Sequence, residues 1–275
     1  MSEQVRTVSV GGQLIGGERL ALIAGPCVLE DPAMAHDAAA RLRDLTAQLQ
    51  VPFIFKASFD KANRTSVTSY RGPGLERGLE TLAGIKAAVG VPVVSDVHET
   101  HQVRPAAAVL DMLQIPAFLC RQTDLLVAAG ETGLPLNLKK GQFLAPDDMR
   151  HCVEKVRSTG NESITLCERG STFGYHNLVV DMRGLVIMRS LGYPVVFDVT
   201  HSVQLPGGGE GRSGGERRFA APLARAAVAV GVDAIFAEVH PDPDHALCDG
   251  PNMLPLAEVA PLLRTLLEVR SACRT

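Results

Sequence analysis

The 275-residue sequence predicts a (β/α)8 barrel, because eight apolar runs alternate with helical patterns along the chain. One such barrel takes about 250 residues, so residues 1–275 are expected to form a single domain. A doubly wound open sheet is the alternative, since a periodic pattern cannot show whether a sheet closes on itself.

A hairpin is expected first, within residues 1–18, because VSVGGQLI alternates in polarity around Gly11 and Gly12. It precedes the first apolar run, so we expect it to cap the bottom of the barrel.

The eight apolar runs are continuous rather than alternating, which is typical of strands buried on both faces. They are LALIAG (20–25), PFIFKA (52–57), PVVSDV (92–97), MLQIPA (112–117), LPLNLK (134–139), SITLCE (163–168), PVVFDV (194–199) and AIFAEV (234–239). Between them, apolar residues recur at helical spacing, as in the set Leu75, Leu79, Leu82 and Ile85. Helical crossovers of this kind indicate parallel strands.

A glycine-rich stretch, LPGGGEGRSGGERR at 205–218, follows the seventh run. So many glycines argue against a rigid segment, and we expect a mobile lid over the barrel.

Charge and composition exclude several classes of function. The net charge is −3, so no overall basic field favours nucleic acid or a membrane surface. No apolar stretch approaches the roughly 18 residues of a membrane span, and the N-terminus has no signal-like region. Six cysteines form no CxxC pair, and we interpret them as reduced thiols in a cytoplasmic protein.

Cations gather where the runs end, which in a barrel is where chemistry takes place. They are Lys56, Lys61, Arg64, Lys139 and Arg169. Arginine binds phosphate through a bidentate fork and lysine supplies a point charge. Five cations exceed what one phosphate needs, so two phosphates, or a phosphate and a carboxylate, are the expected ligands.

A second group at the strand ends has metal-binding chemistry: Cys27, His201, Glu238 and Asp249. They come from the ends of the first, seventh and eighth runs, which are neighbours in a closed barrel, and their donors suit Zn²⁺, Fe²⁺ or Mn²⁺. The alternative is that Cys27 packs as a small apolar residue. HPDPDH at 240–245 is a further cluster, but its two prolines predict a rigid turn.

Long segments of the chain resemble the 3-deoxy-D-manno-octulosonate 8-phosphate synthase family. They are FKASFDKANRTS, YRGPGLE, SDVHE, QIPAFLCRQTDLL, NLKKGQF, ERGSTFGYHNLVVDMR, FDVTHSVQLPGG and EVHPDPDHALCDGPN. The resemblance implies a (β/α)8 barrel, a homotetramer, and a role in the pathway that feeds lipopolysaccharide. It also implies condensation of phosphoenolpyruvate with D-arabinose 5-phosphate and water, which yields the eight-carbon sugar phosphate and inorganic phosphate.

The resemblance also implies roles for single residues. Those matched to phosphoenolpyruvate are Lys56, Ser58, Lys61, Gln114, Lys139 and Arg169. Those matched to arabinose 5-phosphate, partly across a subunit interface, are Asn63, Arg64 and Ser66. Asp96 and His98 match residues near the aldehyde and the sugar hydroxyls. The candidates for the chemical step are Lys61, Asp96, His98, His201 and Asp249.

The family has two branches, and the one with a cysteine at the position of Cys27 requires a divalent metal. Cys27, His201, Glu238 and Asp249 match its four ligands, which implies Zn, Fe, Mn or Co as cofactor. One segment departs: CDGPN (248–252) resembles the metal-free branch. Two other functions stay open, namely a seven-carbon synthase that uses erythrose 4-phosphate and a non-catalytic sugar-phosphate sensor.

Overall fold

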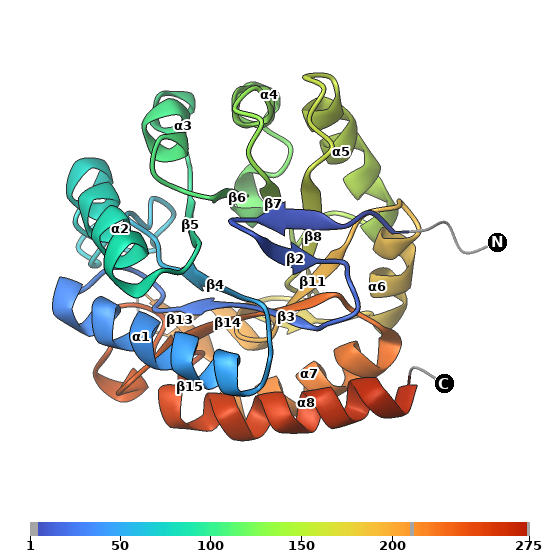
Figure 1. The fold of residues 1–275 in the computed structure, drawn as a ribbon. Helices are drawn as coiled ribbons and strands as arrows, with labels where there is room; N and C mark the ends of the chain where they lie inside the picture. Colours follow the sequence, from blue (N-terminus) through green and yellow to red (C-terminus); the bar gives the residue numbers. More distant parts are fainter. Residues whose placement is uncertain (1–4, 210–211, 274–275) are drawn as a thin grey trace.

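The computed structural model describes residues 5–209 and 212–273, and a closed ring of parallel strands forms its centre (Figure 1). The ring strands are β3 (Ala21–Gly25), β4 (Phe53–Lys56), β5 (Val93–Asp96), β6 (Met112–Ile115), β7 (Leu136–Lys139), β8 (Ile164–Glu168), β11 (Val195–Asp198) and β14 (Ala234–His240). Each overlaps one predicted run. β14 pairs with both β3 and β11, which closes the ring. The barrel prediction is confirmed, and the open-sheet alternative is wrong.

Helices surround the strands as an outer layer (Figure 1). They are α1 (Pro32–Gln48), α2 (Leu75–Val89), α3 (Thr100–Ala107), α4 (Thr123–Gly130), α5 (Met149–Arg157), α6 (Met182–Arg189), α7 (Ala220–Val230) and α8 (Val259–Cys273). The main apolar core lies between this layer and the strands. Helix α1 shows how an element begins: Asp31 is its N-cap and accepts a 2.8 Å hydrogen bond from the Met34 amide, ahead of Pro32.

Short elements connect and extend the barrel. The strands are β9 (Ser171–Thr172), which pairs with β10 (Leu178–Val179), and β15 (Leu254–Pro255), which pairs with β14. The 3-10 turns are Ala117–Leu119, Pro146–Asp148, His201–Val203, Arg217–Phe219, Pro243–His245 and Leu256–Glu258. No helix within the described ranges is long and apolar enough to cross a membrane.

The N-terminal hairpin lies across the ring in Figure 1 and consists of β1 (Val8–Val10) and β2 (Gln13–Ile15). Its apolar residues join the core inside the barrel. A Cβ on Gly11, which has φ +53°, would lie 2.7 Å from Pro92, the residue at the entry to β5. The hairpin therefore closes the end where the strands begin, as predicted.

The glycine-rich stretch forms an antiparallel ribbon in its described part, β12 (Gln204–Gly209) with β13 (Arg212–Gly215). The prediction of a mobile lid did not include this pairing; residues 210 and 211 lie outside the described residues. The ribbon follows the His201–Val203 turn, so it lies at the C-terminal end of the barrel. Its mobility stays a prediction.

Candidate active site

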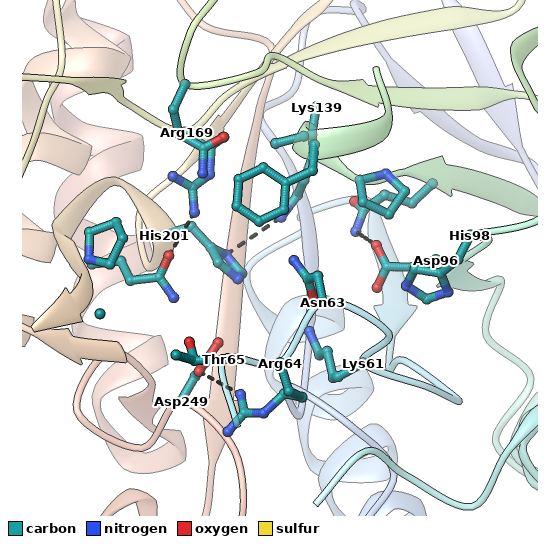
Figure 2. Close-up of a pocket in the computed structure, with 18 of the residues that line it drawn as sticks. Lys61, Asn63, Arg64, Thr65, Asp96, His98, Lys139, Arg169, His201 and Asp249 are labelled. Carbon is teal, nitrogen blue, oxygen red and sulfur yellow. Dashed lines mark hydrogen bonds and ion pairs between the residues drawn. The ribbon is translucent and has the colours of Figure 1, made fainter. Parts of the chain in front are cut away.

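A cavity opens at the C-terminal ends of the strands, and Figure 2 shows side chains from several strands directed into it. Its lining residues are Lys56, Lys61, Asn63, Arg64, Thr65, Asp96, His98, Gln114, Pro116, Ala117, Phe118, Lys139, Gln142, Arg169, His201, Gln204, Pro206, Gly207 and Asp249. All five predicted cations are present, against two carboxylates. The lining therefore favours anionic ligands.

Arg169 is a buried cation whose partners do not neutralise it. Its side chain follows β8, the residue is 4% exposed, and Nη2 donates a 2.9 Å hydrogen bond to the neutral Gln204 amide. Its Nη1 is buried and has no hydrogen-bond partner among the described residues. Burial lowers the pKa of Arg169. A desolvated guanidinium with a free N–H group is suited to bind an anion.

Lys139, at the end of β7, faces the same side of the cavity as Arg169 (Figure 2). Its ammonium donates to Asp198 Oδ2 at 2.6 Å. Burial alone would lower the pKa of Lys139, but Asp198 raises it overall. Lys139 is therefore a fixed positive charge beside Arg169.

Lys56 and Lys61 share one carboxylate oxygen. The Lys56 ammonium, which is fully buried, donates to Glu238 Oε1 at 2.9 Å and to the Cys27 carbonyl at 3.1 Å. The Lys61 ammonium donates to the same oxygen at 3.1 Å. Burial would raise the pKa of Glu238, but these lysines hold it well below its usual range. Lys61 is the more exposed of the two and is better placed to meet a ligand.

Asp96 stands at the centre of a buried polar network. Its carboxylate accepts hydrogen bonds from the Ser58 hydroxyl and, at 2.7 Å, from the Gln114 amide. Burial would raise the pKa of Asp96, but Lys56, Lys61 and Lys139 lower it below its usual range. Ser58 is fully buried and does not line the cavity, whereas Gln114 does.

His98 lines the cavity beside Asp96 (Figure 2). Burial lowers the pKa of His98, so the imidazole is neutral at neutral pH. Its Nδ1 is buried and has no hydrogen-bond partner within the described residues. A neutral ring with an unused nitrogen can donate to, or accept from, a sugar hydroxyl.

The segment predicted to bind the sugar phosphate is only partly in the cavity. Asn63, Arg64 and Thr65 line it, but Ser66 does not, and the Ser66 hydroxyl lies 2.9 Å from the Thr68 hydroxyl. Arg64 Nη1 donates at 3.0 Å both to Asp249 Oδ1 and to Cys248 Sγ. Arg64 Nε is buried and unpaired in the part of the chain that the structure describes. Sequence reasoning missed Thr65.

The four predicted metal ligands meet, but as two overlapping groups that share Asp249 rather than as one. These are Cys27 with Cys248 and Asp249, and His201 with Glu238 and Asp249; the ligand atoms within each group lie within 4.8 Å of one another. Cys27 Sγ lies 3.8 Å from Asp249 Oδ2, and His201 Nε2 lies 3.6 Å from Glu238 Oε2. Ligand atoms around tetrahedral zinc stand roughly 3.3–3.8 Å apart, given its bond lengths.

One carboxylate oxygen of this group is direct evidence for a cation-binding site. Glu238 Oε2 is buried and has no hydrogen-bond partner among the described residues, while Oε1 is held by the two lysines. A buried carboxylate oxygen without a partner is costly unless a cation or donor meets it. The residues present therefore fit a divalent metal ion.

Cys248 is a neighbour that sequence reasoning did not assign to the site. Its sulfur lies 2.8 Å from that of Cys27, and both residues are buried. Burial and the contact with Cys248 raise the pKa of Cys27 well above its usual value. The only signal in the sequence was its position beside Asp249 in CDGPN.

Asp198 was also missed, although FDVTH places it three residues before His201. It is fully buried at the end of β11 and contacts both Lys139 and His201. Gln142 and Gln204 likewise line the cavity without having been assigned there.

HPDPDH forms a turn, as its prolines predicted, and not a ligand cluster. Pro243–His245 is a 3-10 turn, and His245 pairs at 2.7 Å with Asp242, both on the surface.

Comparisons with known proteins place the chain in a family. The family model described as the DAHP synthetase I family matches residues 4–275. A 2-dehydro-3-deoxyphosphooctonate aldolase of Geobacter metallireducens is 60% identical over 262 residues, which cover 95% of this chain and 96% of the relative.

Two further relatives carry the same name. The protein of Trichlorobacter lovleyi is 58% identical over 270 residues, which cover 98% of this chain and 99% of the relative. That of Desulfatibacillum aliphaticivorans is 59% identical over 268 residues, covering 97% and 98%. This name is a synonym for the synthase family that the sequence resembles. The chain therefore belongs to the 2-dehydro-3-deoxyphosphooctonate aldolase family, within the broader DAHP synthetase I family.

Proposed function

We propose that the chain condenses phosphoenolpyruvate with D-arabinose 5-phosphate and water, releasing inorganic phosphate and 3-deoxy-D-manno-octulosonate 8-phosphate. The proposal rests on the surroundings of Arg169. Its buried Nη1 lacks a partner within the described residues, and its neighbour Lys139 is a fixed cation. A second anion-binding group, Arg64, lies across the cavity (Figure 2). Two anionic substrates account for both.

Phosphoenolpyruvate lies between two sets of cations, Arg169 with Lys139 on one side and Lys61 on the other. Arg169 and Lys139, with Gln114, hold its phosphate, and Lys61 meets its carboxylate. Lys56 acts indirectly, because its ammonium already donates hydrogen bonds to Glu238 and to the Cys27 carbonyl. Ser58 acts in the same indirect way, through its hydrogen bond to Asp96.

Arabinose 5-phosphate places its phosphate at Arg64 and Asn63. Its aldehyde and hydroxyls lie toward Asp96 and His98, which supply one acceptor and one neutral ring. Ser66 is outside the cavity of a single chain, so its contribution requires a neighbouring subunit.

A homotetramer is part of the proposal. Large apolar side chains are exposed on loops at the C-terminal end of the barrel: Phe118, Phe143, Phe173 and Tyr175. Exposed apolar groups near a site are typical of surfaces that another protein covers. Sedimentation of the purified chain tests this; a monomer would contradict it.

Cys27, His201, Glu238 and Asp249 would hold a divalent cation, with Zn, Fe, Mn and Co as the candidates that suit a thiolate, an imidazole and carboxylates. When bound, such an ion polarises a carbonyl oxygen or lowers the pKa of a bound water.

The reaction forms one carbon–carbon bond, between C3 of phosphoenolpyruvate and the aldehyde carbon of the sugar. Water adds at C2, and the C2–O bond to phosphate breaks. Fixed cations offset the repulsion between the two anions and hold the reacting carbons close. The β12–β13 ribbon, which contributes Pro206 and Gly207 to the lining, excludes bulk water when it closes.

Phosphate release with different aldoses tests the proposal. The purified protein is incubated with phosphoenolpyruvate and arabinose 5-phosphate, with phosphoenolpyruvate and erythrose 4-phosphate, or with phosphoenolpyruvate alone. Mass spectrometry then determines the mass of the product. We expect the five-carbon sugar to have the higher kcat/KM and to give an eight-carbon product. Faster turnover of erythrose 4-phosphate would indicate the seven-carbon synthase, and no turnover with either would favour a sensor.

A further inference from the structure

We propose that Asp198 is a positioning residue that holds a proton on Nδ1 of His201, so that Nε2 is the ring nitrogen that faces Glu238. The inference rests on the proposed function, because it concerns the same cavity. It gives a role to Asp198, a buried residue that lies beside the proposed phosphate-binding and metal-binding groups but does not line the cavity itself.

Two groups compete for Nδ1 of His201. Asp198 Oδ2 lies 2.8 Å away, whereas the Lys139 ammonium lies 3.5 Å away. An ammonium only donates and an ionised carboxylate only accepts, so Nδ1 serves one of them and not both. The distance of 2.8 Å is that of a good hydrogen bond, and 3.5 Å is at the limit of one. The proton therefore lies on Nδ1 and is donated to Asp198.

The other ring nitrogen, Nε2, then faces a carboxylate. Nε2 lies 3.6 Å from Glu238 Oε2, which is too long for a hydrogen bond. That oxygen is buried and unpaired within the described residues. An imidazole nitrogen and a carboxylate oxygen at this separation can both bind one cation. Histidine ligands commonly hold this tautomer by donating their second N–H to a carboxylate.

Asp198 itself cannot easily turn away. Its Oδ1 accepts hydrogen bonds from the Thr200 amide at 3.1 Å, the Thr200 hydroxyl at 3.0 Å and the His201 amide at 2.9 Å. The Thr200 hydroxyl in turn accepts from the Glu238 amide at 3.1 Å. The aspartate is thus fixed to the turn that carries His201 and, through Thr200, to β14.

The same carboxylate also fixes the phosphoenolpyruvate side of the cavity. Oδ2 accepts from Lys139 at 2.6 Å as well as from His201. Asp198 therefore orients one group predicted to bind metal and one predicted to bind phosphate, and a change at Asp198 should affect both.

A tautomer measurement tests the inference without any metal. In metal-free protein labelled with ¹⁵N-histidine, the shifts of the two ring nitrogens distinguish a protonated from an unprotonated atom, and the His201→Asn variant identifies the signal. We expect a protonated Nδ1 in the wild type. A wild-type ring whose Nδ1 carries no proton would overturn the proposal. Because this measurement uses the wild type, it does not depend on how well a variant folds.

Metal affinity supplies the second readout. The Asp198→Asn amide can offer N–H to Nδ1 and favour the wrong tautomer, so we expect Co²⁺ to bind about 10- to 100-fold more weakly, the range known for such partners. The KM for phosphoenolpyruvate should rise as well. An affinity equal to that of the wild type would contradict the role.

Asp233→Asn is the matched control. Asp233 is an equally buried aspartate at the opposite end of the strands, where it pairs with Arg189 and accepts from the Val195 amide at 2.8 Å. Its loss should lower the melting temperature but leave Co²⁺ affinity unchanged; equal loss of affinity in both variants would mean that Asp198 is merely structural. A wild type that binds no Co²⁺, yet has Nδ1 protonated, would refute the metal proposal and leave the tautomer assignment standing.

Discussion

Arg169 and Lys56 are both buried cations at strand ends, but their surroundings give them different tasks. Lys56 donates to a carboxylate and a carbonyl, whereas Arg169 has only an amide partner and an unused N–H. An unpaired buried cation is destabilising until an anion meets it. At the scale of the residue, the unused donors mark where we expect ligands to bind.

Arg169→Lys should therefore weaken phosphoenolpyruvate use. The lysine keeps the charge but loses the fork, and a hydrogen bond to a charged group contributes about 1.5–3 kcal/mol, or on the order of 10- to 100-fold in kcat/KM. Steady-state kinetics measure this. Arg157→Lys, an exposed arginine paired with Glu162, is the control. Equal kinetics for the two variants would refute the assignment of Arg169.

Arg64→Ala should raise the KM for arabinose 5-phosphate more than that for phosphoenolpyruvate, because Arg64 lies across the cavity from Arg169, where we propose that the sugar phosphate binds (Figure 2). The variant also releases Asp249 and Cys248 from their 3.0 Å contacts, so a lower kcat is expected too. An unchanged KM for the sugar phosphate would contradict its role.

Stability in acid should depend on Asp96. Its pKa is below the usual range in the folded chain, so the unfolded chain binds a proton there more readily. Its contribution to stability is complete above about pH 4 and is lost as the pH falls toward the folded value. Asp96→Asn should therefore flatten the fall in the free energy of unfolding below about pH 4. Urea unfolding at several pH values measures this; identical slopes would contradict it.

At the scale of elements, one contact ties the loop that carries Asp249 to the barrel. Glu30 lies in AGPCVLE, three residues after Cys27, and its Oε1 accepts a 3.0 Å hydrogen bond from the Leu247 amide. His240, the last residue of β14, lies 3.8 Å from the same carboxylate. The carboxylate thus joins the turn after β3 to the loop that carries Cys248 and Asp249.

Glu30→Ala should loosen that loop. We expect faster hydrogen exchange in residues 241–252 and weaker Co²⁺ binding, whereas Glu30→Gln, which keeps an acceptor oxygen, should restore most of both. Tyr70→Phe is the control, because it removes a 2.9 Å hydrogen bond to Leu29 in the same turn without touching Leu247. Exchange in Glu30→Ala no faster than in Tyr70→Phe would contradict this role.

The elements also show what the sequence could predict. Strands buried on both faces and a Gly-Gly hairpin have local patterns, and both were predicted correctly. The β12–β13 ribbon was not, because its pairing of Leu205 with Gly214 depends on register and on close approach, which glycine content alone does not reveal.

At the scale of the molecule, barrel closure makes the site. β14 lies between β3 and β11, so residues from both ends of the sequence become neighbours. That adjacency predicted the meeting of Cys27, His201, Glu238 and Asp249. It could not predict that Ser58 and Ser66 lie outside the cavity, or that Asp198 and Cys248 lie beside the ligands, because these depend on side-chain directions that no pattern encodes.

The central claim is that this closed barrel condenses phosphoenolpyruvate with arabinose 5-phosphate at a site that needs a divalent metal. The most direct measurement is phosphate release by the purified chain, before chelation, after it, and after adding back Zn²⁺, Mn²⁺ or Co²⁺, with Cys27→Ala alongside. We predict that chelation abolishes activity, that a metal restores it in the wild type, and that Cys27→Ala stays inactive. Full turnover by the chelated wild type or by Cys27→Ala would contradict the account.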